Sequence, residues 1–270
     1  MNEHQELERC RNLVEQRLGE YFTQDADYAV LLESMRYSLI GGGKRLRAVI
    51  CLKFCEAVSG DMENAVNAAC AVEMLHTYSL IHDDLPCMDD DDMRRGKPSN
   101  HIKYGECTAV LSGDALHSAA FELIAQSDLP PERVVEMIKI FAQSAGAHGI
   151  CGGQYLDMFG PATTADALTK IHELKTAALF SAAARLGAIA GGGTPEQVTA
   201  AQQYAEALGF AFQVRDDVLD NTAFAVLLGE DECASLVCAQ TEKAASAVSG
   251  KFENADFLIW LARMMAQRKS

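Results

Sequence analysis

Hydrophobic positions recur every three to four residues along most of the chain, which is the pattern of amphipathic α-helices. Strand-like alternation is scarce, and Ala, Leu, Glu and Met dominate between the breaks. The prolines stand where a helical pattern ends or begins, at positions 86, 98, 130, 131, 161 and 195. We therefore predict an all-α fold of about ten helices.

The same pattern places the helices along the chain. We expect them at roughly residues 3–21, 28–40, 62–82, 108–126, 132–147, 165–189 and 195–220. No shift of composition and no Gly/Ser-rich linker separates these segments, and the sequence contains no internal repeat. We therefore predict one domain over residues 1–270.

Composition narrows the class of protein. Hydrophobic residues make up 49% of the 270, and the net charge of −15 argues against a nucleic-acid partner. No apolar run approaches the roughly 20 residues of a membrane span, and the polar residues 1–6 do not resemble a signal peptide. The nine cysteines form no C-x-x-C pair, so we expect reduced thiols in a cytoplasmic protein without stable membrane association.

One stretch carries most of the candidate chemistry. Residues 83–92 contain six aspartates, and Arg94 and Arg95 follow almost at once. Carboxylates this close repel one another unless a cation neutralises them, and Mg²⁺ prefers carboxylate and phosphate oxygens. Arginine binds phosphate through its planar fork. The stretch therefore indicates a metal–diphosphate site, although most charge runs are simply solvated surface.

The geometry of this stretch depends on how the preceding helix ends. Pro86 prevents its simple continuation. Asp83 and Asp89 are six positions apart and would not align on a regular helix. An irregular turn over residues 85–88 would bring them together.

A second acidic cluster changes the balance between these interpretations. Gln213, Asp216 and Asp220 share one face of the predicted helix 195–220, at positions i, i+3 and i+7. Like charges four residues apart destabilise a helix, so Asp216 and Asp220 favour a bound cation. Two acidic helix ends, each near basic residues, are better explained by metal and diphosphate than by solvated surface.

Weaker signals come from basic residues. Lys44 and Arg47 share a face where a helix begins after three glycines, although glycine also simply ends helices. His76 lies two turns before Asp83 on nearly the same face, but a histidine in an apolar helix usually belongs to the core.

Two further pairs are open to both interpretations. Lys175 and Thr176 are typical either of anion binding or of a lysine that extends to solvent from an apolar helix. Gln154 and Asp157 share a face after two glycines that allow close helix packing.

Taken together, these motifs resemble the trans-isoprenyl diphosphate synthases, most closely the bacterial farnesyl diphosphate synthases. The resemblance extends from about residue 31 through nearly the whole chain. It rests on the motifs GGGKRLR at 41–47, HDDLPCMDDDD at 82–92, RRGKP at 94–98, GGQxxD at 152–157, KT at 175–176 and FQxxDDxLD at 212–220. The family fold implies one bundle of antiparallel helices around a central cavity, normally as a homodimer.

The resemblance implies a role for each matching residue. Asp83, Asp84, Asp89 and Asp216 would hold Mg²⁺, with Asp220 assisting through water. Gln154 and Asp157 would line the cavity near the reacting carbons. The diphosphate ligands form two further sets: Arg94, Lys175, Thr176 and Gln213 for the allylic substrate, and Lys44, Arg47, His76 and Arg95 for isopentenyl diphosphate.

The implied reaction is head-to-tail prenyl transfer from dimethylallyl or geranyl diphosphate. Three Mg²⁺ ions per site, replaceable by Mn²⁺, and the cationic side chains would stabilise the charge that develops on the departing diphosphate. The catalytic set is then Asp83, Asp89, Arg94, Lys175 and Asp216. A closed apolar cavity would keep water from quenching the allylic cation.

Product length should follow cavity depth. Tyr78, five residues before Asp83, occupies the position that often forms the cavity floor in this family, and the small Ser79 follows it. This pattern implies the fifteen-carbon product (2E,6E)-farnesyl diphosphate. A geranyl or geranylgeranyl diphosphate synthase, or a non-catalytic regulatory subunit of such an enzyme, remains an alternative.

The sequence departs from the family after Asp220. The family pattern has a Gly-Asp and a mobile loop with lysines there, whereas this chain continues with Asn221 and Thr222. The sequence leaves open a true deletion or a flexible loop omitted from the numbering, and we favour the flexible loop. A true deletion would remove the lid and its lysines.

Overall fold

The computed structural model describes residues 2–160 and 163–268, so Pro161 lies outside the described residues. Helices dominate, which confirms the predicted all-α class. The helices are α1 (Glu3–Gly19), α2 (Ala29–Leu39), α3 (Leu46–Ser59), α4 (Val66–Asp83), α5 (Asn100–Tyr104), α6 (Glu106–Ala125), α7 (Pro131–Ala145), α8 (Ile150–Phe159), α9 (Ala165–His172), α10 (Ala178–Ala190), α11 (Pro195–Asp220), α12 (Ala223–Leu228), α13 (Glu230–Val248) and α14 (Asp256–Ala266).

Three short elements interrupt the helical pattern. A 3-10 turn, η1 (Glu63–Ala65), precedes α4, and a π-helical turn, η2 (Glu173–Ala177), joins α9 to α10. The strands β1 (Met93–Arg94) and β2 (Lys97–Pro98) pair as an antiparallel hairpin. Within the described residues, the structure has more α-helices than the predicted ten. The expected helix 165–189 is divided into α9, η2 and α10, and short helices such as α5 and α12 add to the number.

The chain groups into two compact units, Met1–Val49 with Val66–Asp128, and Ile50–Ala65 with Leu129–Ser270. This grouping follows from contacts alone, so a single domain over 1–270 stays a prediction. In the first unit α4 packs against α1, α2 and α6. A side chain at Gly113 of α6 would lie about 2.2 Å from the His82 ring, so glycine permits the close approach of α6 to α4.

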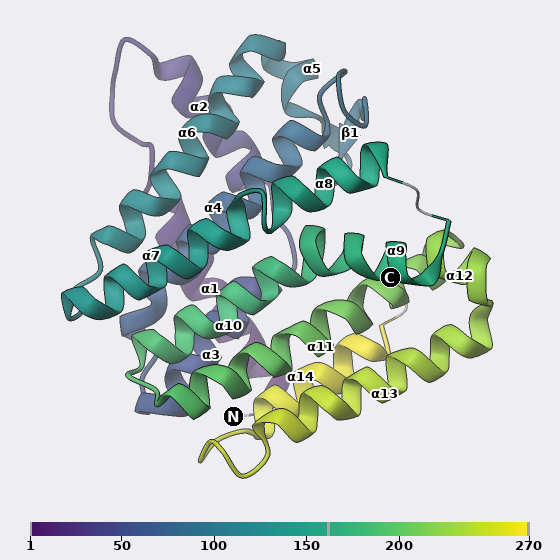
Figure 1. Cartoon of the computed structure of the whole chain (residues 1–270). Coiled ribbons are helices and arrows are strands. Elements are labelled where there is room, and N and C mark those ends of the chain that lie inside the picture. Colours follow the sequence, from purple (N-terminus) through teal and green to yellow (C-terminus); the bar gives the residue numbers. More distant parts are fainter. Residues whose placement is uncertain (1, 161–162, 269–270) are drawn as a thin grey trace. The chain divides into compact units, whose positions relative to one another are not determined.

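The second unit is built around α11, which packs between α10 and α13 (Figure 1). Its start is fixed by a capping box between Thr194 and Gln197, with Pro195 in the first turn. It ends at Asn221, which takes the left-handed conformation. At the centre of the unit the Tyr204 hydroxyl donates to the Leu258 carbonyl at 2.7 Å.

The chain is continuous from α11 to α13. Asn221 and Thr222 lead into α12, and α13 begins directly after Gly229. The favoured flexible loop is therefore wrong for this sequence, because nothing intervenes where the family pattern has a lysine-bearing segment. The deletion is real in this chain.

All nine cysteines are free thiols, five of them buried, as expected from their spacing. Within the described part of the chain, no helix is both long and apolar enough to cross a membrane.

Candidate active site

The first acidic cluster lies on an irregular turn that closes α4. The backbone N–H of Asp89 donates to the carbonyl of Asp83 at 2.9 Å, and that of Asp90 donates to Leu85 at 3.2 Å. The chain therefore folds back over residues 85–88, as expected after Pro86, and sets the backbones of Asp83 and Asp89 side by side.

Asp84 and Arg94, two predicted ligand-binding residues, bind each other in the first unit. Asp84 is 2% exposed and accepts from Arg94 Nε at 2.9 Å and also from Nη2, while Arg94 Nη2 reaches Asp91 at 3.0 Å. Burial raises the pKa of the Asp84 carboxyl, and Arg94 opposes that rise. The predicted roles of Asp84 on metal and Arg94 on diphosphate would require this pair to open, and they stay predictions.

Arg95 is held by the β1–β2 hairpin, which the sequence pattern did not predict. Arg95 and Gly96 form its turn, both with positive φ (54° and 74°), the conformation of tight two-residue hairpins. The Arg95 guanidinium donates to the Gly42 carbonyl. The hairpin thus brings Arg95 against the glycine segment that precedes Lys44.

Arg45, between the two predicted basic ligands Lys44 and Arg47, has a structural role. Its buried side chain forms ion pairs with Glu15 at 2.7 Å and Glu73 at 3.1 Å. These pairs anchor the segment before α3. No local pattern separates Arg45 from its basic neighbours, because its burial, which sets it apart, depends on distant contacts.

His76 lies among the predicted isopentenyl diphosphate ligands. Burial, and then the positive charges of Arg47 and Arg95, lower the pKa of His76 well below its ordinary value. Arg45 and Arg94 act in the same direction. The structure therefore brings the positive charges of Arg47 and Arg95 close to a neutral His76. Lys44, three positions before Arg47, is exposed.

Tyr78 faces α6 from α4. Its ring stands 5.0 Å from the rings of both His82 and His117, edge to face in each case. The Ser79 hydroxyl donates to the His76 carbonyl. The predicted role of Tyr78 and Ser79 in product length stays a prediction.

In the second unit, Lys175 and Asp157 form an ion pair of 2.5 Å. Lys175 belongs to the π-helical turn η2, a rare form that often marks functional positions. Gly153 permits the arrangement, because a Cβ there would lie about 2.2 Å from the Lys175 backbone nitrogen. Two predicted site residues, one on α8 and one on η2, are thereby brought into contact.

Thr176 and Gln213, both predicted diphosphate ligands, are also neighbours. The Thr176 hydroxyl donates to the Gln213 amide oxygen at 3.1 Å, and the Gln213 amide donates to Asp217 at 3.4 Å. Asp217 is buried, and its other oxygen, Oδ2, accepts from the Phe224 backbone at 3.3 Å and lies 3.4 Å from His172 Nε2. Asp217 therefore holds α11 to α9 and α12, and the sequence did not reveal this role.

Asp216, the predicted metal ligand of the second cluster, pairs with Arg268. The Arg268 Nη2 atom lies 2.5 Å from Asp216 Oδ1. Sequence reasoning missed Arg268 because a lone arginine 52 positions away carries no local signal. Asp220 stands exposed at the last turn of α11.

Gln154 is the remaining predicted site residue. It is 7% exposed, and neither its amide nitrogen nor its amide oxygen finds a hydrogen-bond partner among the residues placed by the structure. Such unsatisfied buried groups cost free energy unless water or a ligand binds them. Gln154 is therefore suited to contact a ligand.

The acidic residues fit Mg²⁺ in one particular mode. Across residues 2–160 and 163–268, no three His, Cys, Asp or Glu side chains converge as metal ligands. Mg²⁺ usually binds through one or two carboxylates together with substrate phosphates. Asp83 with Asp89 in the first unit, and Asp216 in the second, would suit that mode, although Asp216 is paired with Arg268.

The fold and these motifs define a class of all-α proteins with aspartate-rich helix ends and basic diphosphate ligands. The family model of the polyprenyl synthetases matches residues 28–236. The chain belongs to the polyprenyl synthetase family.

The similar proteins are named for products of different chain length. A chloroplastic geranylgeranyl pyrophosphate synthase from Capsicum annuum is 50% identical over 217 residues, 78% of this chain and 59% of the relative. An FPP/GFPP synthase structure from Zymomonas mobilis has a TM-score of 0.89 at 36% identity, covering 96% of this chain and 98% of the other. A geranylgeranyl pyrophosphate synthetase from the archaeon Geoglobus acetivorans has a TM-score of 0.90 at 27% identity, covering 97% and 99%.

The chain spans about three fifths of the length of the curated relatives it matches. We therefore treat the activity, substrates and assembly of this chain as proposals.

Proposed function

We propose that the chain is a prenyltransferase. It condenses isopentenyl diphosphate with dimethylallyl and geranyl diphosphate to give (2E,6E)-farnesyl diphosphate. The observation that carries the proposal is that two arginines, Arg47 and Arg95, act together on the buried, neutral His76 in a protein of net charge −15. Guanidinium groups bind phosphate oxygens through charge-assisted hydrogen bonds, so this pair of arginines is suited to an anionic substrate.

The second unit supports the same proposal. Lys175, Thr176 and Gln213 present an ammonium, a hydroxyl and an amide from adjacent positions, which are the donors that a diphosphate requires. When bound by Asp83, Asp89 and Asp216, Mg²⁺ would supply neutralisation of the charge that develops on the departing diphosphate. Arg95 and Lys175 would hold the two substrates in orientation.

We favour a fifteen-carbon product because Tyr78 is a large residue at the expected floor position. The geranylgeranyl synthases among the relatives favour a twenty-carbon product. We further propose a homodimer in the cytoplasm, the compartment that the free thiols favour.

One observation favours a second function, that of a non-catalytic subunit. The lysine-bearing segment expected after Asp220 is absent, so part of the diphosphate grip expected from the resemblance is lost. A non-catalytic subunit that only binds a catalytic partner would not need this segment itself.

One incubation separates the two functions. The purified chain is mixed with labelled isopentenyl diphosphate and dimethylallyl diphosphate, with Mg²⁺ or with EDTA, and products are separated by reversed-phase chromatography. We expect a Mg²⁺-dependent fifteen-carbon product. Only unreacted substrate at high enzyme concentration would reject the prenyltransferase and favour the subunit.

A further inference from the structure

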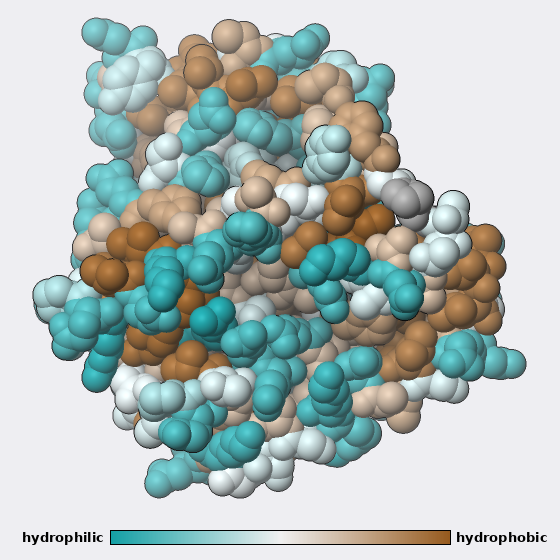
Figure 2. Space-filling model, viewed as in Figure 1, coloured by the Kyte–Doolittle hydropathy of each residue, from teal (hydrophilic) through white to brown (hydrophobic). Residues whose placement is uncertain are grey.

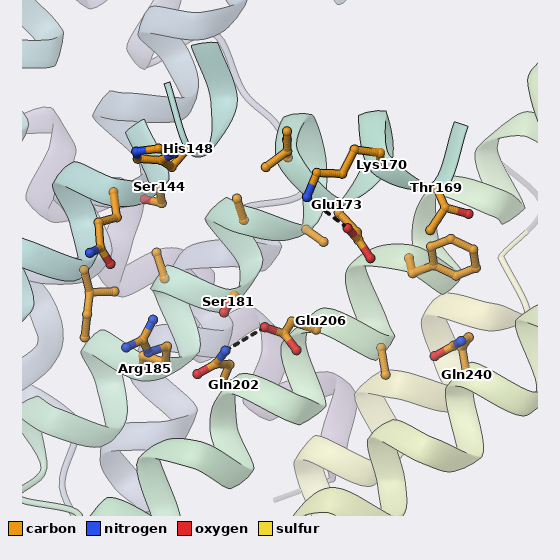
Figure 3. A pocket seen from close by; sticks show the side chains of 18 of the residues that line it. Ser144, His148, Thr169, Lys170, Glu173, Ser181, Arg185, Gln202, Glu206 and Gln240 are labelled. Atoms are coloured by element: carbon orange, nitrogen blue, oxygen red, sulfur yellow. Dashed lines mark hydrogen bonds and ion pairs between the residues drawn. The ribbon is translucent and has the colours of Figure 1, made fainter. Parts of the chain in front are cut away.

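A cavity of about 580 Å³ opens between α7, α9, α10, α11 and α13 in the second unit (Figure 3). Its volume is typical of small-molecule sites. The residues that line it include none of Lys175, Thr176, Gln213 and Asp216. The cavity is thus separate from the diphosphate-binding residues proposed above.

Two polar side chains of α10 reach this cavity without a partner. Ser181 is 8% exposed, and its hydroxyl forms no hydrogen bond within the described ranges, although helical serines commonly bond a carbonyl one turn back. Arg185, four residues later on the same face, has a buried Nε without a hydrogen-bond partner. Burial lowers the pKa of Arg185. Both groups are suited to an anion.

The charges around the cavity favour a ligand with a single anionic group. The lining has three basic residues, Lys170, Arg185 and Lys243, against two acidic ones, Glu173 and Glu206. Lys170 lies 3.5 Å from Glu173, and Gln202 donates to Glu206 at 2.8 Å, as the dashed lines of Figure 3 show. Arg185 is the basic residue on the same helix as Ser181, and the charges of Glu136 and Glu206 oppose the lowering of its pKa.

The rest of the lining is apolar. Ile140, Leu174, Ala178 and Phe210 provide a wall beside the polar end. Figure 2 shows small and apolar residues in a hollow over α10 and α11, bordered by hydrophilic side chains. A ligand with one anionic group and a hydrocarbon body would satisfy both parts.

We propose that this cavity binds an amphipathic organic anion, a carboxylate or a phosphate monoester. Its oxygens accept from Arg185 and Ser181, and its hydrocarbon body packs against Ile140, Leu174 and Phe210.

Because the cavity adjoins the π-helical turn η2, a ligand bound in it acts on the proposed diphosphate ligands of that turn. Leu174 and Ala177 line it, and they flank Lys175 and Thr176 in the five-residue π-helical turn. A molecule packed on Leu174 therefore shifts the equilibrium geometry of Lys175. We infer, on the basis of the proposed function, that the ligand and diphosphate change each other's affinity, as linkage requires.

Calorimetric titration of the full chain tests the site. Sodium dodecanoate, dodecyl phosphate and inorganic phosphate are compared below their micelle concentrations, and the tighter amphiphile identifies the head group. We expect one site, binding inorganic phosphate at least ten times more weakly. Arg185→Gln should weaken binding at least tenfold and Ser181→Ala about threefold, which corresponds to one lost hydrogen bond.

Two controls locate the site. Arg263→Gln, an exposed arginine on α14 of the same unit, should leave amphiphile binding unchanged, and so should Lys175→Ala. Lack of amphiphile binding to the wild-type chain would overturn the proposal. So would wild-type affinity in a folded Arg185→Gln variant, or loss of binding in Lys175→Ala. If Arg185→Gln does not fold, Ser181→Ala and Lys175→Ala decide.

The coupling has a separate readout. The dissociation constant of inorganic diphosphate, measured with and without saturating amphiphile, should change at least threefold in the wild-type chain and stay constant in Arg185→Gln. A constant value in the wild type would overturn the coupling. Prenyl transfer is measured separately, by chromatography. Loss of the proposed activity is therefore distinguishable from an absence of amphiphile binding.

Discussion

The guanidinium of Arg268 lies 2.5 Å from the carboxylate of Asp216, the first aspartate of the second cluster. The same guanidinium stacks 3.7 Å over the Phe212 ring and donates to the Phe212 carbonyl at 2.9 Å. The Arg268 carbonyl in turn accepts from Arg215. Asp216 is therefore paired with a fixed cation, and a metal ion that uses this carboxylate must compete with Arg268.

Arg268→Gln should therefore strengthen metal binding. An ion pair of limited exposure contributes on the order of 1 kcal/mol, so we expect a rise of about threefold to tenfold in Mn²⁺ affinity. Electron paramagnetic resonance of free Mn²⁺ measures this, with Arg263→Gln as the control. Weaker Mn²⁺ binding in Arg268→Gln would show that Arg268 supports the metal site instead of competing with it.

Asp216 and Asp217 are neighbours with opposite expected phenotypes. Asp217→Asn should lower the free energy of unfolding by about 1–3 kcal/mol, because Asp217 is buried and accepts from Phe224 and Gln213. Asp216→Asn should cost at most about 1 kcal/mol, the contribution of its ion pair with Arg268, and reduce kcat about a hundredfold or more. Urea denaturation and product assays measure the two quantities. Equal losses of stability in both variants would contradict the assignment.

Local sequence signals predicted the parts of the fold that depend on local interactions. The bounds of α11 coincide with the expected 195–220, because a capping box starts the helix and a left-handed asparagine ends it. The turn after Asp83 was likewise foreseeable from Pro86. Both are set by residues within a few positions of the boundary.

Other features depend on distant contacts and had no local signal. The π-helical turn that carries Lys175 lies inside an unbroken helical pattern, and a contact with Gly153 accompanies it. Asp83 and Asp84 are indistinguishable in the sequence, yet Asp84 is buried on Arg94. The pairing of Arg268 with Asp216 could not be predicted for the same reason.

Tyr78→Ala should lengthen the product. The ring packs edge to face against His117 on α6, so its removal opens space of the size of an aromatic side chain beside α4. We expect twenty-carbon or longer chains in place of fifteen, read by chromatography after dephosphorylation. Ser79→Ala, a change of one oxygen atom at the next position, should keep the wild-type product. A fifteen-carbon product from Tyr78→Ala would show that the floor lies elsewhere.

The surroundings of His76 predict how stability depends on pH. Burial and the charges of Arg47 and Arg95 hold its pKa well below the ordinary 6.5. Below about pH 6.5 the unfolded chain therefore binds a proton at His76 that the folded chain does not. The free energy of unfolding should fall as pH decreases through this range, by up to about 1.4 kcal/mol per pH unit for one proton. The loss should end only below the folded-state pKa.

Urea denaturation at a series of pH values measures this dependence. His76→Gln should reduce the slope of the free energy of unfolding against pH by the contribution of one proton. His148→Gln, at an exposed position, should leave this slope unchanged. Inorganic diphosphate should also flatten the slope, because an anion bound by Arg47 and Arg95 offsets the charges that oppose protonation of His76. An identical slope in the wild type and His76→Gln would mean that His76 is protonated alike in both states. The charges of Arg47 and Arg95 could then not be acting on it.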